Sequence, residues 1–561
     1  MRIKGFVYDL ARGLRGDADY LEKMIERLAR YGFNMLVLQL ENRLQFPSRP
    51  AIGTTTSLSP SDIQRLDQTA VRLGMDLVPC VNSAGHCEGI GYMEQYRDVV
   101  VDPSGSTGGV EQLKVGDPEA LRLIRDLYHD LFAMFSSAYV HIGGDEIRWL
   151  AMQMPDATEE QRWTKAMEHL TYILELVRSN GKIPMMWGDM LLKYENTISL
   201  IPDDVIICDW AYFSAPQLKE LSNRKSQHIF KNAGKYAIAA PAVNLFHGNP
   251  VLSVNSTLNI TSFFADNQSV YEPDGSGVLL CTWENDRGNF FSPAWPWIAM
   301  QGALFAGNSV REMEFLQTYT AREWGVDSDE LARWYDWIDV QVQKTLLFEA
   351  TIDENVRKAL ESKKNRPQLL IRELVIALFR SQNILPVLYG ARSWLTSRVR
   401  SELREIAVKA EGIASSMLEK AKYRREEPFM LLEWTQVFAA IIDMADALHE
   451  AETHYATAAR SEFSDQSVHG QALGDCIGAF EKLQRLVDRL VRWSELLVEK
   501  ENASDEECWW IGQARLDLNQ RTKKLTDRSN GNRGMIHFLV FIRLHPDTPF
   551  SPLYYRTALK P

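Results

Sequence analysis

The sequence is poor in the features that mark secreted, membrane and zinc-binding proteins. Its six cysteines form no Cys-x-x-Cys pair, so no metal site is expected. The first residues lead straight into a predicted strand, without the apolar run of about 7–15 residues that a signal peptide carries. No stretch has the length and apolarity of a membrane span. We therefore expect a cytoplasmic protein whose thiols are buried and free.

Positive charge is also scarce. Lys and Arg number 62 against 74 Asp and Glu, which gives a net charge of −12 and a pI near 5.5. A protein with this balance is a poor partner for nucleic acid or for an anionic membrane surface. The sequence also lacks a glycine-rich phosphate-binding loop. A neutral ligand such as a sugar is compatible with this composition. The sequence does not predict the oligomeric state.

Strand and helix patterning is plentiful. The chain has 561 residues, 45% hydrophobic and 24% charged, which is typical of a soluble globular protein of two or three domains. In the first half, eight apolar runs of strand length alternate with helical segments. This alternation predicts an α/β fold, a (β/α)8 TIM barrel over residues 1–310. The predicted strands are residues 3–9, 35–40, 77–82, 138–140, 183–187, 205–209, 236–240 and 278–283.

Strand patterning stops after about residue 310. Apolar residues then recur at spacings of three and four, which predicts a C-terminal, mainly α-helical domain over residues 311–561. The long helices could instead form a coiled coil with a partner, but Trp434, Trp509 and Trp510 favour local packing. The predicted helices are residues 397–422, 432–448 and 477–497, and residues 536–542 could form a strand.

One stretch stands apart from this patterning, the run from His141 to Glu146. An apolar strand leads into two glycines, and Asp145 and Glu146 follow side by side. Adjacent carboxylates repel each other and resist burial, so they are a poor choice for stability. A turn at the end of a strand would explain the glycines but not the His or the second acid. We interpret the two carboxylates as catalytic groups with separate tasks, placed where the glycines let a ligand approach the backbone.

This stretch resembles the signature of glycoside hydrolase family 20, the β-N-acetylhexosaminidases. Their motif is His-x-Gly-Gly-Asp-Glu at the end of the fourth strand of a (β/α)8 barrel, and every fixed position is matched here. The resemblance covers roughly residues 1–310. Many relatives carry a small α+β domain before the barrel, and we expect none here.

The resemblance also implies residues that bind the substrate. Asp9 and Arg12 resemble the family's Asp-x-x-Arg, in which the Arg binds the 3- and 4-hydroxyls of the terminal sugar. His86, in a segment similar to the family's Pro-Gly-His with Ala84 in the Pro place, is expected to orient Glu146 or its partners. His141 is expected to act similarly.

Tryptophans follow three of the predicted strands, namely Trp187, Trp210 and Trp283. In the resembling enzymes such residues form the walls of the pocket that folds the 2-acetamido group beneath the anomeric carbon. The resemblance assigns Tyr212 as the hydroxyl that binds the acetamido oxygen. It also implies an acid beside the last Trp for the 4- and 6-hydroxyls, but the family's Trp-x-Glu reads Trp-Glu-Asn-Asp here. Glu284 is the first choice for this acid and Asp286 the second.

The mechanism implied by the family is retaining exo-hydrolysis of terminal β-linked N-acetylglucosamine or N-acetylgalactosamine from a glycan or glycoconjugate. Glu146, kept protonated by a partly desolvated site, would be the acid and later the base. The substrate's acetamido oxygen would attack and form an oxazolinium ion, and Asp145 would stabilise the developing charge. No cofactor is needed.

Two other functions remain open. A barrel glycosidase with a direct carboxylate nucleophile needs a second acid about 5 Å from the first, for which Glu284 or Asp286 is available. A sugar-binding protein without catalysis is the other alternative, but binding alone does not require an acid of raised pKa.

Overall fold

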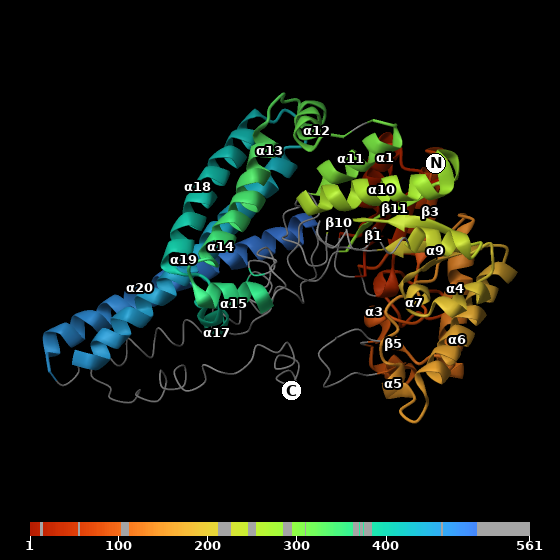
Figure 1. The fold of residues 1–561 in the computed structure, drawn as a ribbon, viewed down its shortest axis with the longest axis horizontal. Coiled ribbons are helices and arrows are strands. Elements are labelled where there is room, and N and C mark those ends of the chain that lie inside the picture. The colour runs from red at the N-terminus through yellow and green to blue at the C-terminus, as the bar shows by residue number, and fades with distance from the viewer. Residues whose placement is uncertain are drawn as a thin grey trace. The chain divides into compact units, whose positions relative to one another are not determined.

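The computed structural model describes most of the chain (Figure 1). The residues that it describes are 1–11, 15–53, 56–91, 93–101, 112–210, 226–244, 254–283, 294–308, 310–362, 370, 374, 384–461 and 464–501. The chain forms two compact units. The first comprises Met1–Phe246, Val254–Glu284 and Ala294–Val310, and the second comprises His247–Ser253, Asn285–Pro293 and Arg311–Pro561.

The first unit is a closed parallel β-barrel surrounded by helices, as predicted. Eight strands of a nine-stranded sheet form the barrel, which closes where β1 pairs in parallel with β11. The barrel strands are β1 (Ile3–Asp9), β2 (Met35–Gln39), β3 (Asp76–Cys80), β6 (Tyr139–His141), β7 (Ile183–Trp187), β8 (Ile206–Trp210), β9 (Tyr236–Ala240) and β11 (Gly277–Thr282). The ninth strand, β10 (Ala242–Asn244), pairs with β11. A separate antiparallel pair, β4 (Val100–Val101) and β5 (Gln112–Leu113), lies in the connection after β3.

Helices connect the strands, and local sequence signals set where several of them begin. Thr158 caps α6 by accepting from the Gln161 N–H while the Gln161 side chain accepts from the Thr158 N–H, which forms a capping box. Asp117 caps α4, with Pro118 in its first turn. The helices are α1 (Ala18–Arg30), α2 (Pro60–Arg72), α3 (Glu88–Gly91), α4 (Pro118–Met134), α5 (Leu150–Gln153), α6 (Glu159–Ser179), α7 (Asp189–Lys193), α9 (Ser226–Asn232), α10 (Val254–Gly275) and α11 (Trp295–Phe305).

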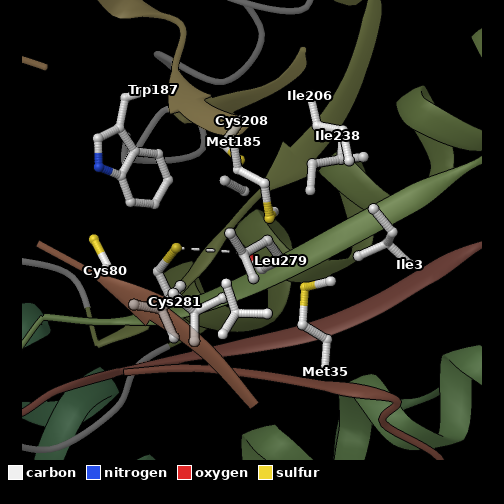
Figure 2. Packing of buried hydrophobic residues seen from close by; sticks show 14 of the residues in the cluster. Ile3, Met35, Cys80, Met185, Trp187, Ile206, Cys208, Ile238, Leu279 and Cys281 are labelled. Carbon is white, nitrogen blue, oxygen red and sulfur yellow. Dashed lines mark hydrogen bonds between the residues drawn. The ribbon is translucent and has the colours of Figure 1, made fainter. Parts of the chain in front are cut away.

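Apolar side chains from the barrel strands fill the barrel interior (Figure 2). Figure 2 shows Cys80, Cys208 and Cys281 pointing into this cluster together with Trp187 and Leu279. Such side-chain layers make the interior of a (β/α)8 barrel a packed core rather than a pore. The buried thiols are free, as expected, and Cys476 of the second unit is also buried and free. Cys508 lies outside the described residues.

The described part of the second unit is helical and has a core of its own. The Trp334 indole N–H donates to Thr435 Oγ1 at 3.0 Å, and the Trp334 and Trp434 rings meet edge to face at 6.2 Å. Glu427 accepts from the Tyr319 hydroxyl at 2.6 Å and from the Trp324 indole at 3.0 Å. These contacts confirm local packing for Trp434. Trp509, Trp510 and the predicted strand 536–542 lie outside the described residues.

The helices of the second unit include three long ones that pack side by side in sequence order, α18 against α19 and α19 against α20 (Figure 1). Contrary to the expectation that no stretch has the length and apolarity of a membrane span, α19 meets both criteria, alone among the described helices. Of its most apolar window, 61% is buried inside the protein, as in the core helix of a helical domain. The helices are α12 (Glu312–Tyr319), α13 (Glu330–Tyr335), α14 (Val342–Glu349), α15 (Glu354–Ser362), α17 (Ile384–Ala391), α18 (Ser397–Lys420), α19 (Glu426–Ser461) and α20 (Gln466–Glu501), with π-helical turns at Thr320–Trp324 and Asp336–Gln341.

Candidate active site

The candidate site residues lie where the barrel strands end. His86 follows β3, Asp145 and Glu146 follow β6, and Asp189 follows β7. In a closed parallel barrel the carboxyl ends of all strands meet at one rim, which is where such barrels carry their active sites. The fold therefore brings together groups that are up to about a hundred residues apart in the sequence.

The loop after β6 is held to β7 through its backbone. The Ile142 N–H donates to the Met185 carbonyl at 2.8 Å, and the Trp187 N–H donates to the Gly143 carbonyl at 2.9 Å. Gly143 and Gly144 have φ values of 72° and 89°, in the left-handed region that glycine adopts without strain. The glycines of the motif thus turn the chain sharply at the rim and present the two acids that follow.

The loop after β3 packs directly against this turn. The Ser83 N–H donates to the Ile142 carbonyl at 3.1 Å. A methyl group at Gly85 would lie 2.3 Å from the carbonyl oxygen of Asp145, and one at Gly143 would lie 2.4 Å from Oδ1 of Asn82. Both distances are far shorter than any van der Waals contact. Only glycine fits at these positions, and the two loops form one layer.

His86 joins the two acids. Its Nε2 lies 2.9 Å from Oε2 of Glu146 and 3.5 Å from Oδ2 of Asp145. Because a carboxylate oxygen accepts, Nε2 carries the hydrogen in this contact. Both His86 (φ 58°) and Glu146 (φ 48°) have left-handed backbones, which are uncommon for residues other than glycine. Strained backbones of this kind persist where the surrounding contacts fix them and are frequent at functional sites.

The charge state of Glu146 differs from the expectation. Burial opposes its ionisation, but the hydrogen bonds and charges of His86 and Arg148 outweigh burial, so the pKa of Glu146 lies below its usual value. Arg148 forms an ion pair with Oε1 of Glu146. This direction is opposite to the expectation that desolvation keeps Glu146 protonated, because the sequence pattern did not indicate that His86 and Arg148 would bind the carboxylate.

Asp189 is a site residue that the sequence analysis passed over. Its Oδ2 accepts from the Glu146 backbone N–H at 3.1 Å, and its Oδ1 accepts from the Trp210 indole N–H at 3.4 Å. Asp189 retains some exposed surface, yet protein atoms crowd its carboxyl group. This burial and the nearby Asp145 carboxylate raise the pKa of Asp189 to about 7. The signal available in the sequence was its place two residues after a strand-end tryptophan.

His141 lies beneath the turn. Its Nδ1 accepts from the Gly143 N–H at 3.1 Å, so the hydrogen of the neutral ring is on Nε2. Burial lowers the pKa of His141 to about 3, so the ring is neutral. Nε2 is buried without a hydrogen-bond partner among the described residues. His141 therefore braces the glycine turn through one nitrogen and leaves the other available as a donor.

Glu41, after β2, was also missed. It is 1% exposed, and its Oε1 accepts from the Asn82 N–H at 3.1 Å, which anchors the loop that carries His86. Asn82 in turn donates to the His86 carbonyl at 2.8 Å. In the described ranges no group of three or more His, Cys, Asp or Glu side chains is arranged to hold a metal ion.

The match to a known family adds to this geometry. Residues 2–242 match the family described as glycosyl hydrolase family 20, catalytic domain. The match covers less than half of the chain and shows that the barrel is similar to the catalytic domain of this family. The matched segment contains β1 to β9 and the acids after β6, whereas the strand that closes the ring, β11, follows it.

Curated relatives match part of this chain. A lacto-N-biosidase from Bifidobacterium bifidum is 19% identical over 259 residues, which is 44% of this chain and 22% of the relative. A β-N-acetylhexosaminidase from Cellulomonas fimi is 30% identical over 210 residues, which is 33% of this chain and 39% of the relative. The chain thus spans less than half the length of either relative. The solved family 20 exo-β-N-acetylglucosaminidase from Vibrio harveyi, in complex with N-acetylglucosamine, has 16% identity and a TM-score of 0.42, with 56% of each chain covered.

The tryptophans predicted for the family 20 sugar pocket lie at the same rim. The Trp187 ring is 5.4 Å from the Trp283 ring, edge to face, and 4.4 Å from the His141 ring. Trp210 reaches the site through its bond to Asp189. Trp187 is only 1% exposed and is part of the barrel core, and its contact with the sugar stays a prediction. Three predicted site residues, Arg12, Tyr212 and Glu284, lie outside the described residues, as does Asp286, and their roles stay predictions.

Proposed function

We propose that this protein is a retaining exo-β-N-acetylhexosaminidase. Its substrate would be a glycan or glycoconjugate that ends in β-linked N-acetylglucosamine or N-acetylgalactosamine. The observation that carries the proposal is the joint placement of Asp145, Glu146 and His86 at the barrel rim, with His86 Nε2 2.9 Å from Glu146. The hexosaminidase names of several family 20 relatives support the same activity.

In the proposed reaction, Glu146 protonates the leaving oxygen and later deprotonates water. Asp145 stays ionised, accepts the acetamido N–H of the substrate and stabilises positive charge as the oxazolinium ion forms. The acetamido oxygen is the nucleophile, so a bond from this oxygen to the anomeric carbon forms as the glycosidic bond breaks. Adjacent acids favour this route, because they cannot easily supply both an acid above the ring and a nucleophile below it.

The ion pair of Glu146 suggests how its proton is acquired. Arg148 is 49% exposed, so its side chain is not fixed by packing. A sugar that displaces Arg148 and excludes water removes a cation that favours the carboxylate, which raises the pKa of Glu146. Binding of the substrate would thereby convert a paired carboxylate into the protonated acid that the reaction needs.

Turnover of 4-nitrophenyl N-acetyl-β-glucosaminide and the matching galactosaminide tests the proposal. Both should be hydrolysed with retention, and the matching glucoside without the acetamido group should be a very poor substrate. A thiazoline mimic of the cyclised intermediate should inhibit far better than N-acetylglucosamine, since it resembles the state that the site stabilises.

Two results would count against the proposal. Comparable turnover of the plain glucoside, or a glycosyl ester trapped on a protein side chain, would favour the direct carboxylate nucleophile instead. Tight binding of sugars without turnover of any N-acetylhexosaminide would indicate a binding protein.

A further inference from the structure

One carboxylate at the rim contacts two elements of the site at once. Asp189 accepts the Glu146 backbone N–H with Oδ2 at 3.1 Å and the Trp210 indole N–H with Oδ1 at 3.4 Å. Glu146 follows β6, Asp189 follows β7 and Trp210 ends β8, and these three strands are neighbours in the barrel. A single side chain thus links the acid that we assign to catalysis with an aromatic residue that we assign to the sugar pocket.

The bond to Glu146 holds a strained residue. Glu146 has a φ of 48°, which is uncommon for a residue with a Cβ, and its side-chain direction depends on this backbone. Local strain persists only where surrounding contacts over-determine the conformation. The Asp189 carboxylate is such a contact, since it binds the strained residue's own N–H.

The location of Asp189 is itself fixed by close packing. A methyl group at Gly188 would lie 2.9 Å from Cγ2 of Ile207 and 3.0 Å from the Phe230 ring. The Gly188 N–H donates to the Cys208 carbonyl at 3.0 Å, which ties the end of β7 to β8. The chain therefore approaches β8 closely enough at Gly188 for the next residue to reach Trp210.

The chemistry of the two contacts requires a carboxylate. Both partners are N–H donors, so both oxygens of Asp189 must accept. An Asn side chain has one oxygen and one NH2 group, so one donor would always face another donor. A carboxylate is costly at this position. Burial raises the pKa of Asp189 most, and the nearby Asp145 and Glu146 carboxylates raise it further, to about 7. A bond to the backbone alone could be made by an uncharged residue at lower electrostatic cost.

We infer that Asp189 is a positioning residue, which holds the Glu146 backbone and the Trp210 indole in one arrangement and so couples sugar contact at Trp210 to proton transfer by Glu146. The inference rests on the proposed function, because it assigns Glu146 as the acid. By this inference Asp189 does not itself touch the substrate. It acts through Glu146 and Trp210, which are assigned to contact the substrate.

The test uses two substrates that differ in their need for an acid. The 4-nitrophenolate group of a 4-nitrophenyl N-acetylhexosaminide leaves readily without protonation. An alkyl or chito-oligosaccharide aglycone must be protonated as it leaves. In Asp189→Asn, we expect kcat for the second substrate to fall by about 10- to 100-fold, the scale that misplacement of a catalytic group produces. The loss for the 4-nitrophenyl substrate should be clearly smaller. A role in stability alone would lower both by the same factor.

Trp210→Phe provides a second route to the same conclusion. It keeps an aromatic ring against the sugar but removes the indole N–H, so it cuts one of the two bonds while Asp189 stays in place. In the double variant with Asp189→Asn, the combined loss of kcat should be smaller than the product of the single losses, because both changes disrupt one linkage. Glu195→Gln, an exposed change shortly after α7, is the matched control and should leave both substrates unaffected.

The outcomes separate the two proposals. If the wild-type chain turns over neither substrate, the proposed function is wrong and the inference falls with it. If the wild-type chain is active, equal losses for the two substrates in Asp189→Asn, or fully multiplicative effects with Trp210→Phe, would overturn the inference alone. If circular dichroism shows that Asp189→Asn does not fold, Trp210→Phe is assayed on the same two substrates. A larger loss of kcat for the substrate that needs protonation supports the inference, and equal losses overturn it.

Discussion

Asp145, Glu146 and Asp189 share one rim, yet each carboxyl group has different partners. Glu146 is bound by His86 and Arg148, and its pKa lies below its usual value. Among the described residues, Asp189 is bound by two N–H donors and lies near Asp145 and Glu146, and its pKa is raised to about 7. Environments that separate the pKa values of nearby acids are the means by which enzymes divide acid and base tasks. The raised pKa of Asp189 reflects the electrostatic cost of keeping a carboxylate here, which both of its N–H donors require.

At the residue scale, Glu146→Gln should abolish most hydrolysis of substrates with poor leaving groups. The amide keeps the shape of the side chain but supplies no proton, and general acid–base help is typically worth roughly 10²–10⁴-fold. Initial rates on a chito-oligosaccharide measure the loss, and a thermal unfolding curve close to that of the wild type excludes misfolding. Near-full activity of the variant would show that another group is the acid.

The ion pair with Arg148 predicts a pH effect. Arg148 lowers the pKa of Glu146 by favouring its carboxylate. Activity requires protonated Glu146, so kcat/KM declines as pH rises through the pKa of this acid in the free protein. In Arg148→Ala that pKa rises, and the alkaline limb of the kcat/KM profile should move to higher pH.

Arg178→Ala is the matched control for this prediction, because Arg178 is an exposed arginine that pairs with Asp204 away from the rim. Its kcat/KM profile should overlay that of the wild type. A shift of the Arg148→Ala profile to lower pH would contradict the proposed role of Glu146 as the acid.

The sequence predicted the chemical identity of this site better than its electrostatics. Asp145 and Glu146 were identifiable because adjacent acids after two glycines have little value for stability. Asp189 and Glu41 were not, since each matters through one backbone N–H supplied by a segment distant in sequence. Contacts of this kind have no periodicity and leave no local signal.

At the element scale, the two loops after β3 and β6 act as a single layer. Gly85 packs on the Asp145 carbonyl and Gly143 packs on Asn82. The acids are thus positioned by the backbone of a neighbouring loop as well as by their own strand. A site supported by rigid elements on both sides keeps the small tolerances that catalysis needs.

Gly85→Ala should test this layer. The added methyl would meet the Asp145 carbonyl at 2.3 Å, so the loop after β6 must move. We expect kcat to fall by about 100-fold, since displacement of roughly 1 Å has effects of this size. Unfolding by urea should show a destabilisation of about 1–3 kcal/mol, typical of overpacking.

Gly275→Ala is the control for the added methyl, because its nearest neighbour is Tyr271 Cβ at 4.0 Å. That variant should keep wild-type activity. If Gly85→Ala were as active as this control, the two loops would not position the acids in the way that we describe.

Elements were predictable in proportion to their length and burial. The strands Ile183–Trp187 and Tyr236–Ala240 have the bounds that the sequence predicts, because buried parallel strands are continuous apolar runs that end at polar residues. The pair β4 and β5 was missed, since two residues per strand show no pattern. The helices that the structure describes from α12 to α17 were not separately predicted, because short or π-helical segments blur the helical spacing.

At the scale of the whole molecule, the chain combines a barrel that is similar to the catalytic domain of glycosyl hydrolase family 20 with a helical unit outside the matched residues. The family match ends at residue 242, and no described part of the second unit is included in it. Each unit buries its own hydrophobic residues, with the barrel interior in the first and the Trp334–Trp434 contact in the second. A domain boundary near residue 310 remains our proposal.

Limited proteolysis of the full chain tests that boundary. A domain with its own core resists cleavage, whereas the connection between two domains carries few protecting contacts. Brief digestion with a protease of broad specificity should therefore yield two resistant fragments that meet near residue 310, identified by mass spectrometry. The N-terminal fragment should retain the acids after β6, so its activity can be assayed directly. Fragments that meet well inside residues 1–300 would mean that the boundary is wrong. A single resistant species spanning both units would mean that the two units unfold as one.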